Sequence, residues 1–227
     1  GLWTDSRYFL QAAEQLKDSG IELYKDGLPD TPDIIAFLQS RLQPGESAGI
    51  EGQVFSSASA CAWQSALGSR SIRLQCIEHP FRNIWTDRPP LPEGKAFIHE
   101  AAYAGRSCRE KLADIRLRMT EAGADALLLS ALDEIGWTLN LRGTDIHCNP
   151  VVVSYLLIEQ QKAHFFILPA KTDEHLKDYL AQNGVEVHAY EEILAFLANA
   201  PYASLWLASA KTNYALYTVV PATCRLL

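Results

Sequence analysis

Short apolar runs alternate with amphipathic stretches along the first third of the chain. Apolar positions that recur with helical spacing indicate helices, and short continuous apolar runs indicate buried strands. Thr31 and Pro32 are typical of a helix N-cap and first helical position, and Gly45 lies just past the end of the same helix. The pattern predicts strands over residues 2–4, 21–24, 48–50 and 72–76, and helices over residues 7–17, 33–42 and 57–67.

The alternation continues in the later part of the chain. Ser107 and Glu110 form a capping box, which predicts a helix that runs to residue 122 and ends at Gly123. The following pattern predicts a strand over 126–130, a helix over 132–141, a hairpin of strands over 151–159 and 164–168, helices over 173–181, 191–197 and 212–218, and strands over 185–187 and 205–207. Alternating strands and helices indicate an α/β fold, which we expect to be a mixed β-sheet flanked by helices.

A proline-rich segment over residues 78–94 interrupts this pattern. It contains Pro80, Pro89, Pro90 and Pro92, so neither a regular helix nor a central strand can run through it. We interpret it as a linker between two domains, residues 1–93 and 94–227. Because an exposed Trp leaves a large apolar area in water, we expect Trp85 and the neighbouring Ile84 to pack on other residues.

The two predicted domains share a sequence pattern. Aligning residues 165–190 with residues 1–24 places Gly184 on Gly20 and matches the strands that follow. The next helices both contain Ala-Phe-Leu, at residues 195–197 and 36–38. Repetition at this spacing predicts two copies of one fold.

The ends of the chain differ from those of a complete pair of repeats. Residue 1 aligns with a point deep inside the second copy, so we expect the first copy to be truncated at its N-terminus. Residues 193–227 contain no Asp, Glu or His, and the last of them are apolar. Since natural termini are usually polar, we expect more protein to follow.

The composition narrows the class of protein. The chain of 227 residues is 48% hydrophobic and 21% charged, which is typical of a folded globular protein of one or two domains. Its net charge of -7 has the wrong sign for nucleic-acid binding. No apolar run has the length of a spanning helix, and no signal segment opens the chain, so we expect neither membrane insertion nor secretion. Five cysteines without C-x-x-C spacing favour a reducing, cytoplasmic location.

Two polar motifs have alternative interpretations. Residues 45–49 read Gly-Glu-Ser-Ala-Gly, but a nucleophile elbow needs a strand before Ser47 and a helix after it, which is the reverse of the predicted order. His147 and Cys148 are neighbours that point apart in extended chain, so a structural role for residues 141–150 is favoured over catalysis or metal binding. In that role Gly143 turns the chain, while Arg142 and Asp145 bond buried backbone groups.

Two groups of charged residues are interpreted as structural rather than catalytic. Asp133 and Glu134 begin a predicted helix, where acids interact favourably with the helix dipole. The predicted helix over residues 107–122 and the residue just before it interleave basic and acidic side chains, so we expect all of these to face solvent. They are Arg106, Arg109, Lys111, Arg116 and Arg118 with Glu110, Asp114 and Glu121. Arg7, near Asp5 at a helix start, is by the same rules a surface residue whose planar fork suits a carboxylate or a peptide.

Three motifs nevertheless resemble one enzyme family. Residues 2–13 (Leu-Trp-Thr-Asp-Ser-Arg-Tyr-Phe-Leu-Gln-Ala-Ala), 84–89 (Ile-Trp-Thr-Asp-Arg-Pro) and 131–151 are similar to the long, three-domain form of aminopeptidase P. This is the Xaa-Pro aminopeptidase of the creatinase/prolidase superfamily. Ser6 and Gly136 depart from the family pattern, which usually has Gly and Ala there, and residues 78–81 differ as well.

The resemblance implies two related creatinase/prolidase N-terminal-type domains, both non-catalytic, here without the catalytic domain. Two divalent metal ions, Mn²⁺ or Zn²⁺, would be held by two Asp, one His and two Glu of that further domain, and none in this chain. This piece would be inactive alone, while its parent would cleave peptides with proline second. The family arginine that contacts the peptide matches Arg7, and the leading domains would gate the cleft and support a homodimer.

Two other classes of function remain open. The chain could be a free-standing binding or regulatory module that kept the fold. It could also be an independent hydrolase with Ser47 or Cys148 as its nucleophile. In that case Ser47→Ala or Cys148→Ala, whichever removes the nucleophile, would abolish activity.

Overall fold

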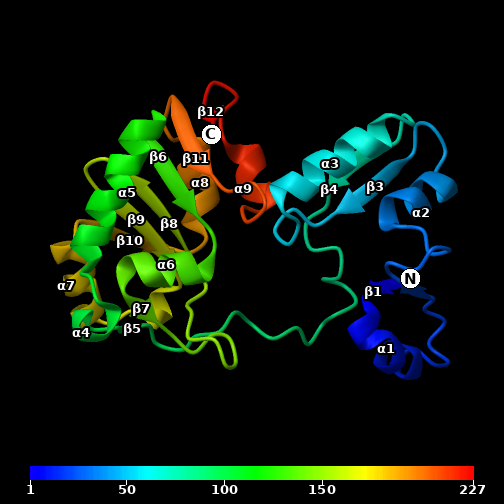
Figure 1. Ribbon diagram of the computed structural model, residues 1–227, viewed down its shortest axis with the longest axis horizontal. Helices are drawn as coiled ribbons and strands as arrows, with labels where there is room; N and C mark the ends of the chain where they lie inside the picture. The colour runs from blue at the N-terminus through cyan, green and yellow to red at the C-terminus, as the bar shows by residue number, and fades with distance from the viewer. The chain divides into compact units, whose positions relative to one another are not determined.

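A computed structural model describes residues 1–227, which form two compact units (Figure 1). Unit 1 comprises Gly1–Glu51 and Ser59–Glu78, and unit 2 comprises Gly52–Ala58 and His79–Leu227. None of the helices combines the length and the apolar character needed to cross a bilayer. The two-domain division at residues 93 and 94 stays a prediction.

Unit 2 contains a six-stranded sheet in the order β10-β9-β8-β6-β11-β12. The strands are β6 (Ala126–Leu129), β8 (Ser154–Glu159), β9 (Ala163–Ile167), β10 (Val185–Ala189), β11 (Ser204–Leu207) and β12 (Arg225–Leu226). β8 runs antiparallel to both β6 and β9, and the other neighbours are parallel. The mixed sheet and the β8–β9 hairpin confirm the sequence predictions for this part of the chain.

Helices cover both faces of this sheet because its strands are apolar on both faces. They are α5 (Cys108–Ala122), α6 (Leu132–Leu139), α7 (Glu174–Gln182), α8 (Glu192–Ala198) and α9 (Tyr214–Val219). Phe165 of β9 packs in one hydrophobic cluster with residues of α5, α6 and α7. The next residue, Phe166, packs in a second cluster with residues of α8 and α9. Both rings are fully buried, so the middle strands form the core of unit 2.

Three short elements between residues 94 and 142 were not predicted from the sequence pattern. β5 (Phe97–Ile98) pairs antiparallel with β7 (Leu141–Arg142), and α4 (Ala101–Ala104) lies between β5 and α5. Helix α6 ends earlier than predicted because Asn140 takes a left-handed conformation, φ 53°, which releases Leu141 into β7. The observed strand β8 is likewise shorter than the strand predicted over residues 151–159, since it begins at Ser154.

Unit 1 contains two separate parallel pairs of strands. β1 (Leu2–Thr4) pairs with β2 (Leu23–Lys25), and β3 (Ser47–Ile50) pairs with β4 (Arg73–Cys76). Its helices are the 3-10 turn η1 (Ser6–Tyr8), α1 (Phe9–Gln15), α2 (Ile34–Arg41) and α3 (Ser57–Gly68), although the first two residues of α3 are assigned to unit 2. The α2 N-cap is Asp33, whose Oδ1 accepts from the Ala36 N–H at 2.7 Å, so the predicted cap at Thr31 is wrong.

The two units repeat one arrangement, as the sequence predicted. β1 and β2 correspond to β9 and β10, and the matched Gly20 and Gly184 both have left-handed φ angles, 74° and 73°. β3 and β4 correspond to β11 and β12, each pair being joined by one helix. Unit 1 has no counterpart of β6 and β8, which make the antiparallel pairings of the larger sheet. Its pairs are therefore parallel and separate.

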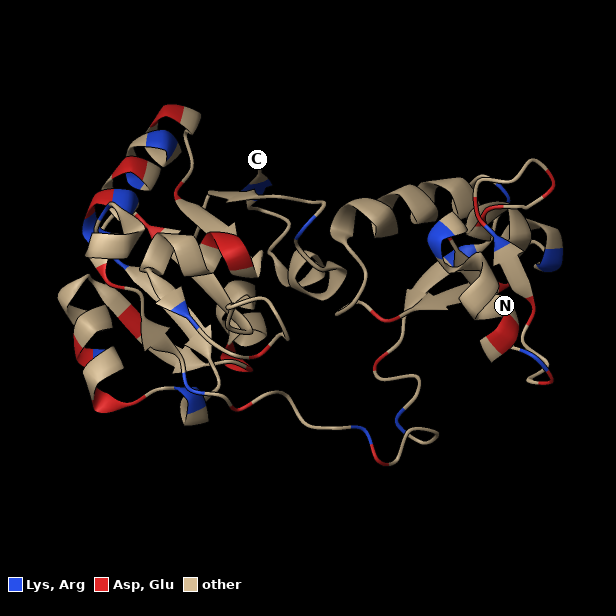
Figure 2. Cartoon of the chain, turned by 60° about the horizontal axis from the view of Figure 1, so that its bottom comes forward, with Lys and Arg blue, Asp and Glu red and all other residues tan.

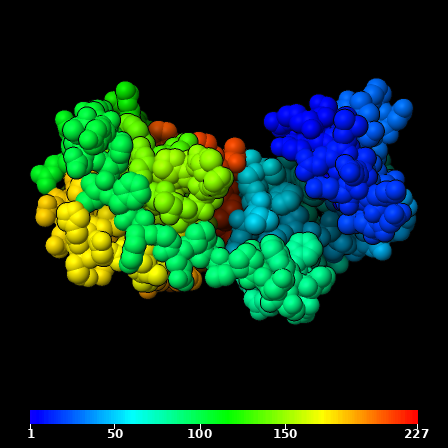
Figure 3. Space-filling view, turned by 90° about the horizontal axis from the view of Figure 1, so that it is seen from below, coloured from blue at the N-terminus to red at the C-terminus, as the bar shows by residue number.

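The proline-rich segment is irregular throughout, which confirms the prediction that no helix or strand crosses it. Its atoms, blue-green in Figure 3, lie at the surface. Ile84 and Trp85 stay 79% and 50% exposed, so the expectation that they pack on other residues is wrong. The Arg88 guanidinium lies 5.5 Å from the centre of the Trp85 ring and covers part of it instead.

Candidate functional site

Arg7 lies in the turn that follows strand β1. Asp5 has extended backbone and caps η1, with its Oδ1 accepting from the Arg7 N–H at 3.0 Å. The Arg7 side chain folds back on the same carboxylate: Nε donates to Oδ1 at 2.9 Å and Nη2 to Oδ2 at 2.8 Å. One carboxylate thus caps the turn and fixes the guanidinium.

The Asp5–Arg7 pair is strongly coupled although it lies in solvent. The hydrogen bonds from Arg7 lower the pKa of Asp5 to about 2, and the pKa of Arg7 is raised. The Arg7 side chain is 77% exposed, and Asp5 occupies its Nε–Nη2 edge. The Nη1 edge is left for a carboxylate or a peptide carbonyl, the two partners that suit this planar donor.

Aromatic side chains fix the strand that carries this turn. Trp3 of β1 stacks on Tyr24 with ring centres 4.0 Å apart, and its Nε1 donates to the Pro32 carbonyl at 2.8 Å. Phe37 packs edge-on against both rings. A pocket of about 300 Å³ beside Trp3 is lined by Trp3, Asp26, Asp33, Ile34, Ile35 and Trp63. Trp3 belongs to the first sequence motif, but that motif did not predict this pocket.

The third motif, residues 131–151, has a structural role in unit 2. Arg142 Nη1 donates to the carbonyls of Gly136 at 2.9 Å and Leu141 at 2.7 Å. Asp145 accepts from the Val153 N–H at 2.6 Å and forms an ion pair with Lys171, both side chains being fully buried. These contacts confirm that Arg142 and Asp145 bond buried backbone groups, while the ion pair with Lys171 was not predicted.

The remaining polar candidates belong to different elements of the chain. His147 and Cys148 are exposed on the loop after β7, where Cys148 has a left-handed φ of 59°. Ser47 begins strand β3 after helix α2, so the Gly-Glu-Ser-Ala-Gly segment has the reverse of the nucleophile-elbow order, as predicted. Asp133 and Glu134 lie in the first turn of α6, also as predicted.

Two basic residues of α5 contradict the expectation of a solvated face. Blue and red segments alternate along the ribbon of this helix (Figure 2), but Lys111 is buried, with Nζ donating to Asn140 Oδ1 at 2.6 Å and to the Trp137 carbonyl at 2.8 Å. Arg116 is partly buried, and its Nε donates to the Glu159 carbonyl at 2.8 Å. Both lie beside the apolar stripe of α5, so its helical spacing was the signal that could have placed them.

His164, Glu186 and His188 form a cluster in unit 2 that was not predicted from the sequence. His164 belongs to β9, and the other two belong to the adjacent strand β10. Glu186 and His188 are two residues apart on one strand, the spacing that places side chains on the same face. That spacing was the available signal, but the pairing with His164 needs the sheet register.

Comparison with known proteins identifies related sequences. The family described as creatinase/prolidase N-terminal domain matches the chain twice, over residues 1–83 and 87–227. Aminopeptidase P2 of Arabidopsis thaliana is 34% identical over 228 residues, which cover 98% of this chain and 32% of that protein. Xaa-Pro aminopeptidase ApepP of Drosophila melanogaster is 34% identical over 232 residues, which cover 99% of this chain and 38% of that protein.

A solved structure agrees with these sequence matches. X-prolyl aminopeptidase of Caenorhabditis elegans, described as a cytosolic enzyme with a di-nuclear active site, is 27% identical with a TM-score of 0.91. The match covers 99% of this chain and 38% of that one. The chain thus spans about a third of the length of the relatives it matches.

Proposed function

This chain belongs to the creatinase/prolidase N-terminal domain family, and from that premise we propose that it is the non-catalytic N-terminal region of a metal-dependent Xaa-Pro aminopeptidase. The parent enzyme removes the first residue from peptides that have proline second, and it acts in the cytosol. The observation that carries this proposal is the match to Xaa-Pro aminopeptidases over nearly the whole chain, at 34% identity.

Within the parent, Arg7 contacts the peptide substrate. Its guanidinium is held by Asp5 along one edge and exposed along the other, so it offers a positioned donor pair to a carboxylate or a carbonyl. The catalytic metal ions, Mn²⁺ or Zn²⁺, would be held by a further domain and would supply an activated water. The present chain gates access to that centre and supports assembly of a homodimer.

Replacing Arg7 in the parent enzyme tests the proposed contact. Arg7→Ala removes a charged hydrogen-bond donor, which is worth about 1.5–3 kcal/mol, so kcat/KM for an Xaa-Pro peptide should fall about tenfold to a hundredfold. Arg7→Lys should restore little of the loss, because an ammonium cannot reproduce the fork. Asp5→Asn should weaken binding less, by freeing the Arg7 side chain.

Arg70→Ala is the matched control, since Arg70 is also exposed in unit 1. If Arg7→Ala and Arg70→Ala leave kcat/KM equally unchanged, the contact with the peptide is refuted while the family assignment stands. An immunoblot of the native product addresses the other part of the proposal. A band at 25.2 kDa, the mass of this chain, would instead support a free-standing binding module.

A further inference from the structure

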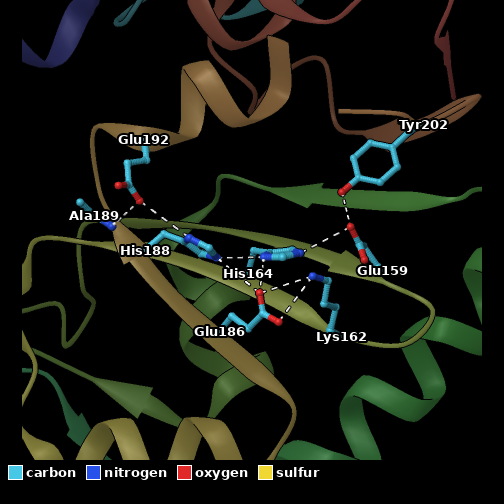
Figure 4. Close-up of polar contacts among 8 residues, drawn as sticks. All are labelled: Glu159, Lys162, His164, Glu186, His188, Ala189, Glu192 and Tyr202. Carbon is cyan, nitrogen blue, oxygen red and sulfur yellow. Dashed lines mark hydrogen bonds and ion pairs between the residues drawn. The ribbon is translucent and has the colours of Figure 1, made fainter. Parts of the chain in front are cut away.

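Three metal-binding side chains of unit 2 converge on one face of the six-stranded sheet (Figure 4). In the parallel pairing of β9 with β10, His164 lies directly opposite Glu186. His188 follows two residues along β10, opposite Phe166, so it shares the face of Glu186. The sheet register therefore brings together two imidazoles and one carboxylate that are 24 or fewer residues apart in sequence.

The distances among the three ligand atoms suit a small metal ion. His164 Nδ1 lies 2.9 Å from His188 Nε2 and 3.4 Å from Glu186 Oε2, and His188 Nε2 lies 3.9 Å from Glu186 Oε2. The point equidistant from the corners of such a triangle is about 2.0 Å from each of them, which is the length of Zn–N and Zn–O bonds in proteins.

We infer that His164, Glu186 and His188 bind a divalent transition-metal ion, of which Zn²⁺ is the best fit. Two imidazoles and one carboxylate are a donor set that zinc accepts, with water in the fourth position. Glu186 is 52% exposed and His188 is 23% exposed, so an ion and its water can enter from solvent. This inference does not depend on the proposed function, because it concerns unit 2 alone.

The second nitrogen of each imidazole faces a further carboxylate, as is usual for histidines that bind metals. His164 Nε2 lies 3.4 Å from Glu159 Oε1, and the Tyr202 hydroxyl donates to that same oxygen at 2.5 Å. His188 Nδ1 lies 3.8 Å from Glu192 Oε2. Both outer carboxylates are drawn in Figure 4. They would orient the rings and make them better donors.

His164 is the most constrained of the three ligands. Its side chain is only 2% exposed, and its Nε2 makes no hydrogen bond, which is costly for a buried polar atom. The Phe196 ring packs 4.6 Å from the His164 ring and fixes its orientation.

Lys162 is the group that competes with a cation for this site. Its Nζ lies 3.5 Å from both carboxylate oxygens of Glu186. Without a metal, a hydrogen bond between the two imidazoles and this ion pair hold the cluster together. A bound ion would replace them with three bonds that tie the edge strand β10 to β9.

Calorimetric titration of the chelator-treated 227-residue chain with Zn²⁺ tests the site. We expect saturable binding of one ion per chain, and a rise in Tm of about 5 °C at a hundredfold excess over Kd. His188→Asn and Glu186→Gln change partly exposed residues, so they should fold normally and lower the affinity at least about a hundredfold. Binding that is absent, or that is unchanged in both variants, would overturn the inference.

Two further variants sharpen the result. His175→Asn removes an exposed histidine of α7 in the same unit and should leave Kd unchanged. Lys162→Met removes the competing cation and should tighten binding severalfold. Co²⁺ should give the visible spectrum of a nitrogen and oxygen site, and a thiolate charge-transfer band would instead assign the ion to a cysteine and refute the site.

Discussion

Cys108 has a buried thiol, which makes the stability of unit 2 decrease at alkaline pH. Burial raises its pKa to about 11, although Lys111 and Arg116 oppose the shift. A group whose pKa is raised in the folded state stabilises the fold below its unfolded pKa and loses that contribution as pH rises through the folded value. The free energy of unfolding should therefore fall between about pH 9 and pH 11, by about 1.4 kcal/mol per pH unit from this group.

Urea denaturation of the chain and of Cys108→Ala at pH 8 and pH 10 measures this effect. Buried tyrosines also titrate in alkali: burial raises the pKa of Tyr179 to about 12. The difference between the two proteins reports the thiol together with its interaction with Tyr179, and the variant should lose less stability between these pH values. Equal losses in both proteins would show that Cys108 contributes nothing to the pH dependence.

The contacts of a single residue could be predicted from the sequence only where the neighbouring backbone determines them. Arg142 and Asp145 were predicted to bond buried backbone groups, because a polar residue beside a turning glycine has few other roles. The position of Lys111 beside the apolar stripe of α5 indicated burial, but its partners Asn140 and Trp137 come from the end of α6 and could not be identified from that spacing. His164 was missed for the same reason, as only the sheet register brings it to Glu186.

At the scale of elements, the capping box predicted at the start of α5 is confirmed, with both of its hydrogen bonds present. The Ser107 Oγ accepts from the Glu110 N–H at 3.3 Å, and Glu110 Oε2 accepts from the Ser107 N–H at 2.8 Å. Ser107→Ala should lower the free energy of unfolding by about 1 kcal/mol, because it leaves helix N–H groups unpaired. Chemical denaturation checks this. Ser107→Thr should restore the stability, and an unchanged midpoint in Ser107→Ala would contradict the argument.

Elements without a periodic pattern could not be predicted. β5 and β7 are two residues long, which is too short for alternation to appear, and α4 is barely one turn. They form because β5 and β7 pair with each other across a long stretch of chain. Longer helices and the β8–β9 hairpin were predicted because their own residues carry the repeat.

At the scale of the whole molecule, the duplication was visible in the sequence because each copy repeats the same order of strand, helix and glycine. Gly20, in the turn before β2, and Gly184, just before β10, both take a left-handed conformation that few other residues accept. The strand order was not visible, since β8 and β6 lie between β9 and β11 through pairings that cross the chain. Those two central strands make the units unequal in packing.

This inequality predicts different opening rates for the two units. In unit 2 the strands β6, β8, β9 and β11 each have two hydrogen-bonded neighbours, whereas β1 and β3 of unit 1 have one each. The hydrophobic cluster of unit 1 is also small, with Ala48, Leu67 and Ile72 as its buried members. Local opening costs least where few apolar contacts and few protected hydrogen bonds hold the backbone.

Amide hydrogen exchange followed by mass spectrometry measures this difference in the 227-residue chain. After correction for intrinsic rates, amides of β1 and β3 should exchange at least about tenfold faster than those of β8 and β9. The edge strand β10 is the internal control: it also has one neighbour, but α7 and α8 cover it in unit 2, so its rate should lie between. Equal protection of β3 and β8 would show that the small cluster in unit 1 is as stable as the full sheet.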